Sequence, residues 1–273
     1  MFQKALILVG LGILAAAFRG CGKGYLKKAG ALLVLLLSFL LGYFVFKNWM
    51  GGLAVASIWI FLPWVELLSR TRKLRFPVNN RLAREKAPNL QFFPDAAAAA
   101  HALENHFFEP VNSSGWHWAG MHQHFITYWH PEECATATIC LCEQEDVVFS
   151  FLSITTETKG GERYRTTNFP FASMLKACDN LVHNHLPCKQ KDFEGVLDQH
   201  RAFLEDRGVT DKDLLMPDPE NIDNLIEAEM QDQLRHNEAA GLIATHADGT
   251  FSYTGKGLLF LWRQFLKDMI RLC

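Results

Sequence analysis

Residues 29–46, AGALLVLLLSFLLGYFVF, contain no charged side chain over 18 positions. Residues 51–65, GGLAVASIWIFLPWV, are also uncharged, and the apolar character continues past Glu66 to Leu68. A helix that crosses the hydrocarbon core of a bilayer needs about 20 apolar residues. Only residues 47–50 separate the two runs, which leaves room for a tight connection. The sequence therefore predicts a transmembrane helical hairpin with spans at about 29–46 and 51–68, within a membrane anchor formed by residues 1–69.

A third apolar run, residues 5–18, precedes the hairpin and is too short to be decisive. Its residues Ala15–Ala17 are of the kind found at a signal-peptide cleavage site, but the basic residues that follow, beginning with Arg19, oppose translocation. This run can be a short third span, a helix lying in the membrane interface, or a cleaved segment, and the sequence leaves all three open.

The placement of Lys and Arg predicts the orientation of the hairpin. Residues 1–76 hold 10 Lys and Arg against the single acidic residue Glu66, and the link inside the hairpin contributes only Lys47. Cytoplasmic flanks of membrane spans are enriched in Lys and Arg. We therefore expect both ends of the hairpin, and residues 70–273, on the cytoplasmic side of the inner (plasma) membrane.

The rest of the chain predicts a basic juxtamembrane linker, 70–94, followed by a cytoplasmic α+β domain, 95–273. Period-2 patterns predict three or four antiparallel strands, and periods near 3.6 predict four or five helices. The expected strands are 124–130, 135–143, 147–158 and 163–168, and the expected helices are 96–108, 171–185, 192–207, 224–240 and 255–272. Residues 111–121 are expected to form a loop or an edge segment.

Composition excludes several classes of protein. The chain is 49% hydrophobic, which excludes a disordered chain, and 7 Cys in 273 residues are too few for a disulfide scaffold. Residues 190–240 hold 14 acidic residues against 5 basic ones, so nucleic-acid binding is not expected. The sequence contains no Gly-x-Ser-x-Gly, Gly-x-Gly-x-x-Gly or P-loop motif, and the interpretation leans away from an enzyme.

Histidine and cysteine pairs in the expected strands offer one candidate site. His122 and His124 would point to one face of a strand, as would Cys140 and Cys142. Imidazole and thiolate are the ligands that zinc prefers, although the spacings match no standard zinc motif. A site for zinc or another transition metal built from these four residues is therefore an alternative to a domain with no cofactor.

The last expected helix has an apolar, aromatic face and a basic face. Such a helix either packs in the domain or lies on an anionic membrane surface. The residues that would contact the membrane are Lys256, Trp262, Arg263, Phe265, Lys267 and Arg271.

These patterns predict a multi-pass membrane protein whose partner is the lipid bilayer, with no expectation about oligomeric state. The expected role is non-enzymatic: a sensing, scaffolding or interaction module with a protein partner at the membrane. A metal-binding sensor or metal-dependent enzyme is one alternative. A subunit of a larger membrane complex is another, in which small residues such as Gly30, Gly42 and Gly51 would pack on a partner helix.

Overall fold

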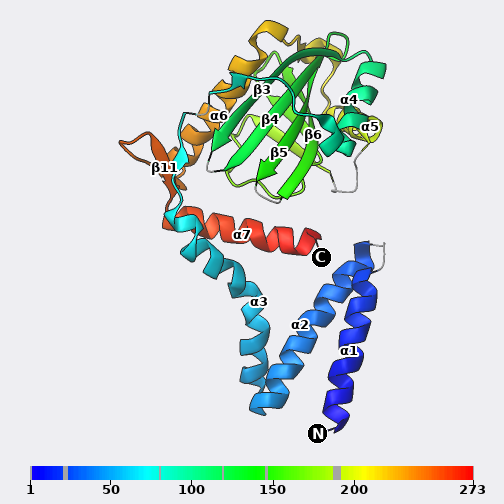
Figure 1. Cartoon of the computed structure of the whole chain (residues 1–273), viewed down its shortest axis with the longest axis vertical. Helices are drawn as coiled ribbons and strands as arrows, with labels where there is room; N and C mark the ends of the chain where they lie inside the picture. Colours follow the sequence, from blue (N-terminus) through cyan, green and yellow to red (C-terminus); the bar gives the residue numbers. More distant parts are fainter. Residues whose placement is uncertain are drawn as a thin grey trace. The chain divides into compact units, whose positions relative to one another are not determined.

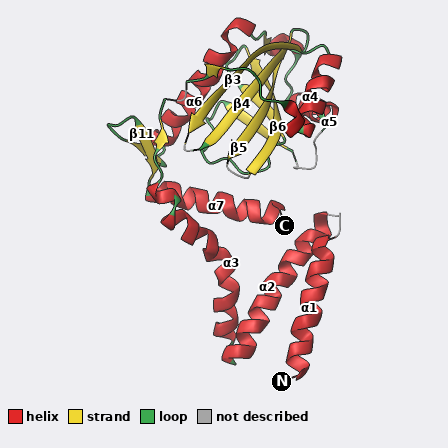
Figure 2. Cartoon of the chain, in the orientation of Figure 1, coloured by secondary structure: helices red, strands yellow, loops and turns green. Residues whose placement is uncertain are grey.

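The structure is a computed structural model that describes residues 2–20, 24–79, 81–118, 120–144, 147–186 and 192–272. The chain forms two compact units: a helical unit of residues 1–74 and 252–273, and a sheet unit of residues 75–251. Figure 1 colours the chain along its sequence, and Figure 2 separates helices from strands. The last helix of the chain therefore belongs to the unit that contains the apolar N-terminal helices, whereas the sequence grouped it with the strands.

The helical unit contains three helices that are long and apolar enough to cross a membrane. They are α1 (Phe2–Gly20), α2 (Gly24–Phe46) and α3 (Trp49–Ser69), and α7 (Gly255–Leu272) completes the unit with the 3-10 turn Thr71–Lys73. The two expected hairpin helices are present at nearly the expected bounds. The ambiguous run 5–18 lies inside α1, which is a continuous helix of 19 residues.

Small residues let these helices approach closely. A Cβ placed on Gly42 of α2 would lie 2.8 Å from Val55 of α3, and one placed on Gly30 would lie 3.1 Å from the carbonyl oxygen of Ala15 in α1. The indole N–H of Trp59 also donates to Ser38 Oγ at 2.9 Å between α3 and α2. The glycines that were expected to face a partner are thus used in packing within the chain.

The sheet unit is built on a sheet of eight strands, twice the number that the sequence predicts. The strands are β2 (Ala83–Arg84), β3 (Glu109–Trp118), β4 (Met121–His130), β5 (Ala135–Gln144), β6 (Val147–Thr158), β7 (Arg163–Thr167), β8 (Leu181–His185) and β9 (Leu214–Leu215). They follow the order β2 to β8 across the sheet, and β9 pairs with the end of β6.

Two segments that were not predicted as strands pair with neighbouring strands of the main sheet. Residues 111–118, expected as a loop or an edge segment, form most of β3, and they pair antiparallel with β4. The segment 171–185, expected as a helix, ends instead in β8, which runs parallel to β7 from Arg163↔Leu181 to Thr167↔His185. Pairing across a sheet outweighs local propensity at these positions.

The segment 70–94 contributes strands rather than serving only as a linker. Its residues Phe76–Pro77 form β1, which pairs with β11 (Thr250–Tyr253), and β11 pairs in turn with β10 (Ile243–Thr245) in a second, three-stranded sheet. Its residues 83–84 form β2 at the edge of the main sheet. Residues 76–84, which follow α3 in the sequence, therefore pair with strands of both sheets.

Helices cover both faces of the main sheet, as Figure 2 shows. On one face, α4 (Pro94–Asn105) and α5 (Phe193–Asp206) enclose the apolar core, which includes Leu103, Ile126, Ile139, Ile154 and Val196. On the opposite face, α6 (Ile222–Ala239) contacts β7 through Glu229. Short 3-10 turns at Leu90–Phe92, Asp211–Asp213 and Pro219–Asn221 lead into or away from these elements.

Candidate metal centre at the edge of the sheet

The β3–β4 hairpin places histidines opposite one another on one face. Gly120 adopts φ +78° in the turn, a conformation that glycine tolerates and that a two-residue hairpin connection requires. The resulting register pairs His117 with His122 and Gly115 with His124. Because side chains alternate along a strand, all three imidazoles lie on the face that carries the apolar core.

Glu85 reaches this histidine cluster from the neighbouring strand. β2 pairs with β3 through Ala83↔Gly115, and the backbone N–H of Glu85 donates to the carbonyl of Ser113 at 3.0 Å. On the opposite face, Arg84 approaches Asp223 of α6 at 3.7 Å. The alternation of the short strand thus directs the Glu85 carboxylate toward the histidines.

The Glu85 carboxylate lies among three imidazoles. Its Oε2 is 3.2 Å from Nε2 of His122 and 4.0 Å from Nδ1 of His124, and its Oε1 is 3.5 Å from Nε2 of His117. The ligand atoms of Glu85, His122 and His124 all lie within 4.8 Å of one another. His117 stacks on His122 with ring centroids 3.8 Å apart, so its imidazole stands at the open side of the group.

His124 is the buried member of the group. Its side chain is 2% exposed, and its Nε2 makes a 2.6 Å hydrogen bond with Ser113 Oγ. Its Nδ1 is buried and has no hydrogen-bond partner among the described residues. Burial and the neighbouring His122 lower the pKa of His124, while Glu85 acts in the opposite direction. The ring is therefore held in the neutral form, which is the form that ligates metals.

Gly115 leaves space for the two ligand atoms beside it. A Cβ at this position would lie 3.1 Å from Glu85 Oε2 and 3.2 Å from His124 Nδ1. These contacts are tighter than nearly all real Cβ contacts, so any larger residue would displace the carboxylate or the imidazole. The absence of a side chain at Gly115 thus preserves the pocket between Glu85 and His124.

The group fits a transition-metal ion of the zinc type. Tetrahedral zinc with bonds near 2.0–2.2 Å to nitrogen and oxygen places its ligand atoms about 3.3 Å apart. The His122–Glu85 distance of 3.2 Å already meets this spacing, and the other ligand-atom spacings, 4.0 Å from Glu85 to His124 and none above 4.8 Å, would have to close by up to about 1.5 Å. The Ser113 contact supplies the outer-shell hydrogen bond that commonly orients a ligating histidine.

The predicted four-residue site of His122, His124, Cys140 and Cys142 is not assembled. The β4–β5 register pairs His124 with Leu141, and it pairs Gln123 with Cys142 and Phe125 with Cys140. Both cysteines consequently lie on the opposite face of the sheet from the histidines. Their sulfurs are 3.8 Å apart, and burial raises the pKa of the Cys140 thiol, so they pack as thiols among apolar groups.

The sequence analysis did not include Glu85 or His117 among the candidate ligands. Glu85 stands 37 residues before His122, in a basic segment without secondary-structure signal. His117 falls in the residues expected to form a loop or an edge segment. A strand prediction for 109–118 with a two-residue connection to the next strand would have placed His117 opposite His122, as the register shows.

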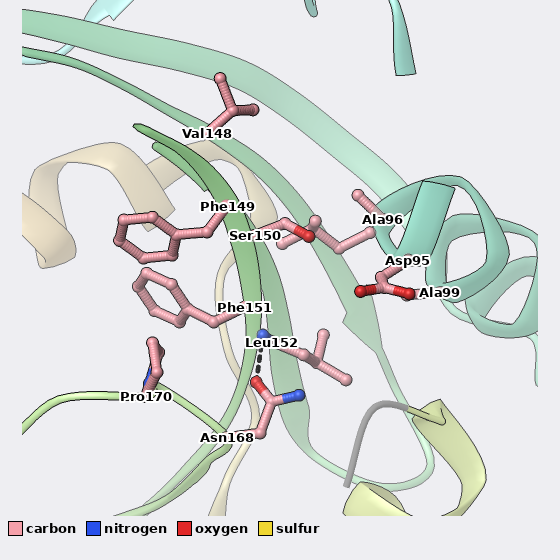
Figure 3. A pocket seen from close by; sticks show the side chains of 11 residues that line it. Asp95, Ala96, Ala99, Val148, Phe149, Ser150, Phe151, Leu152, Asn168 and Pro170 are labelled. Carbon is pink, nitrogen blue, oxygen red and sulfur yellow. Dashed lines mark hydrogen bonds between the residues drawn. The ribbon is translucent and has the colours of Figure 1, made fainter. Parts of the chain in front are cut away.

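Two cavities lie away from this group. One of about 290 Å³ adjoins β6 and the start of α4; Figure 3 shows Phe149 and Phe151 on one side of it and Ala96 on the other, with Asn168 Oδ1 accepting from the Leu152 N–H at 2.7 Å. The other, about 390 Å³, lies against α6, where Glu229 accepts two 2.7 Å hydrogen bonds from Arg165. Arg163 also approaches Glu229, at 3.2 Å.

The predicted membrane-surface residues all lie in α7. Lys256, Arg263 and Lys267 are exposed, whereas Trp262 and Phe265 are half-buried. The side chain of Arg271 lies outside the described part of the structure.

Comparisons with protein-family models, with curated proteins and with solved structures find no match for this chain.

Proposed function

We propose that this chain is a membrane-anchored metal-binding protein that holds one divalent transition-metal ion, with zinc the best match, at Glu85, His122 and His124. The observation that carries the proposal is Nδ1 of His124, a buried nitrogen with no partner among the described residues, 4.0 Å from a carboxylate oxygen. A buried polar atom without a partner is costly, and a metal ion would satisfy it. His117, whose Nε2 lies 3.5 Å from Glu85 Oε1, would have to move closer to His124 to supply a fourth ligand.

In this proposal, α1, α2 and α3 anchor the protein in the plasma membrane, and the sheet unit lies in the cytoplasm. The basic residues on both sides of the hairpin support that orientation. A cytoplasmic metal site on an anchored domain suits a sensing or interaction role. A catalytic role is less well supported, because the cavities described above are lined by other residues.

The test is the metal content and affinity of the full chain, purified in detergent without an affinity His tag. We expect about one equivalent of zinc, and Co²⁺ in its place should give the visible absorption of a tetrahedral ion with nitrogen and oxygen ligands. Glu85→Gln and His122→Asn should each remove the bound metal. His101→Ala, which alters an exposed histidine of α4, is the matched control and should retain it.

Either of two results would contradict the proposal. A folded chain that binds no transition metal even after reconstitution would show that the group is only a hydrogen-bonded cluster. Metal that persists in Glu85→Gln and His122→Asn but is lost in Cys140→Ser would place the site on the other face of the sheet.

A further inference from the structure

The C-terminal helix carries an inference that is independent of the metal site. α7 belongs to the helical unit together with α1, α2 and α3. Its Trp262 indole N–H donates to the carbonyl of Ile60 at 2.9 Å, and its ring meets Trp64 edge to face with centroids 6.2 Å apart. α7 is thus attached to α3 near the end of an apolar helix.

Pro63 lies three residues after Ile60, in the turn of α3 that α7 contacts. Proline has no N–H to donate to the carbonyl of Trp59 four residues earlier, and its ring opens that turn of the helix. The adjacent carbonyl of Ile60 accepts the hydrogen bond of Trp262. The indole N–H of Trp262 thus has an acceptor in an apolar surrounding, where a donor without a partner would be costly.

The attachment lies at the depth of a membrane interface. Trp64 precedes the end of α3, Ser69, by five residues, or about 8 Å along a helix. The chain then continues into the basic residues Arg70, Arg72 and Lys73. Tryptophans and basic flanks of this kind mark the headgroup layer, and helices that lie in a membrane surface are buried about 5–10 Å below it.

The charge pattern of α7 matches this position. Leu258, Leu261, Phe265 and Met269 form one helical face together with Trp262, and Lys256, Arg263 and Lys267 form the opposite, exposed face. Each basic residue near an anionic leaflet contributes about 1 kcal/mol to binding.

We infer that α7 lies in the plane of the membrane surface and that its basic face, Lys256, Arg263 and Lys267, binds the headgroups of anionic lipids. The partner is the lipid surface itself. The segments before and after the sheet unit would then both contact the bilayer. The contacts with α3 determine how deep α7 lies in the membrane surface, and the anionic headgroups stabilise α7 at that depth.

The experiment compares the full chain in nanodiscs of phosphatidylcholine alone and in nanodiscs that also contain phosphatidylglycerol. Backbone amide exchange is measured by mass spectrometry for peptides from residues 255–269. We expect exchange in α7 to be slower by tenfold or more with anionic lipid. The triple variant K256E/R263E/K267E should lose that difference. The matched variant K86E/R207E/K212E changes three exposed basic residues outside α7 and should keep it.

Two outcomes would overturn the inference. Equal exchange of α7 in both lipids would show that attachment to α3 alone holds the helix. Retained anionic-lipid protection in K256E/R263E/K267E would show that the basic face is not what binds. An unchanged thermal unfolding of the sheet unit in both variants establishes that the substitutions act on α7 and not on folding.

Discussion

The substitution Gly115→Ala tests the metal centre without changing any ligand. The added Cβ would stand 3.1 Å from Glu85 Oε2 and 3.2 Å from His124 Nδ1, where ordinary van der Waals contact begins at 3.4 Å. Both ligand atoms must therefore move by a few tenths of an ångström. Metal–ligand bonds tolerate deviations of about 0.2 Å, and disturbing the support of a ligand commonly costs 10–100-fold in affinity.

We expect Gly115→Ala to weaken zinc binding by at least tenfold, equivalent to about 1.4 kcal/mol. Competition titration with a chromophoric chelator measures the affinity of the full chain in detergent. Gly160→Ala is the control, because a Cβ there makes only an ordinary 3.6 Å contact with Thr158 Oγ1. Zinc affinity equal to that of the unsubstituted protein would refute the assignment of Glu85 and His124 as ligands that share the space beside Gly115.

Three further predictions concern stability and the metal. Burial lowers the pKa of His200 to about 4, so the unfolded chain takes up a proton before the folded chain does as pH falls below 6.5. We therefore expect the free energy of unfolding of the sheet unit, measured by denaturant titration, to fall by about 3 kcal/mol between pH 6.5 and 4. A stability that does not change with pH would contradict this. Glu229→Gln leaves the Arg165 guanidinium without its carboxylate partner, and it should lower the free energy of unfolding by about 3–5 kcal/mol. The melting temperature should then fall by roughly 10 °C or more, and a change within about 2 °C would mean that water replaces the ion pair. Zinc should slow tryptic cleavage after Arg81 and Arg84, because the bound ion would fasten Glu85 to β3 and β4, and this protection should be missing in Glu85→Gln.

The apolar helices could be predicted closely because their signal is local. The run 29–46 ends where the uncharged stretch ends, at Phe46, and α2 ends at the same residue. Its start was placed late, since Lys27 and Lys28 are included in the helix even though they interrupt the apolar pattern. A helix boundary follows backbone hydrogen bonding, whereas composition indicates only which residues avoid water.

The candidate site could be predicted in part, and the missing part depends on register. His122 and His124 share a face by alternation alone. In the β4–β5 pairing, His124 faces Leu141, so even-numbered residues of β4 share a face with odd-numbered residues of β5. This register places the histidines on one face of the sheet and Cys140 and Cys142 on the other, and the pattern of residues within a single strand does not predict the register. Glu85 joins the site through pairing between strands that are distant in sequence, which is equally invisible to periodicity.

The pairing of β1 with β11 has a consequence for how the chain could be rearranged. Phe76 and Phe251 are register partners, and their rings lie 5.2 Å apart, so the sheet unit begins and ends at neighbouring positions. Its entry and exit thus form a two-stranded stem, the arrangement of a domain inserted into a host protein at a single loop. The sheet unit can therefore be removed and replaced by a short turn, or inserted into another protein, because its first and last residues are close together. Recombination could exchange the sheet unit while leaving the helical unit unchanged.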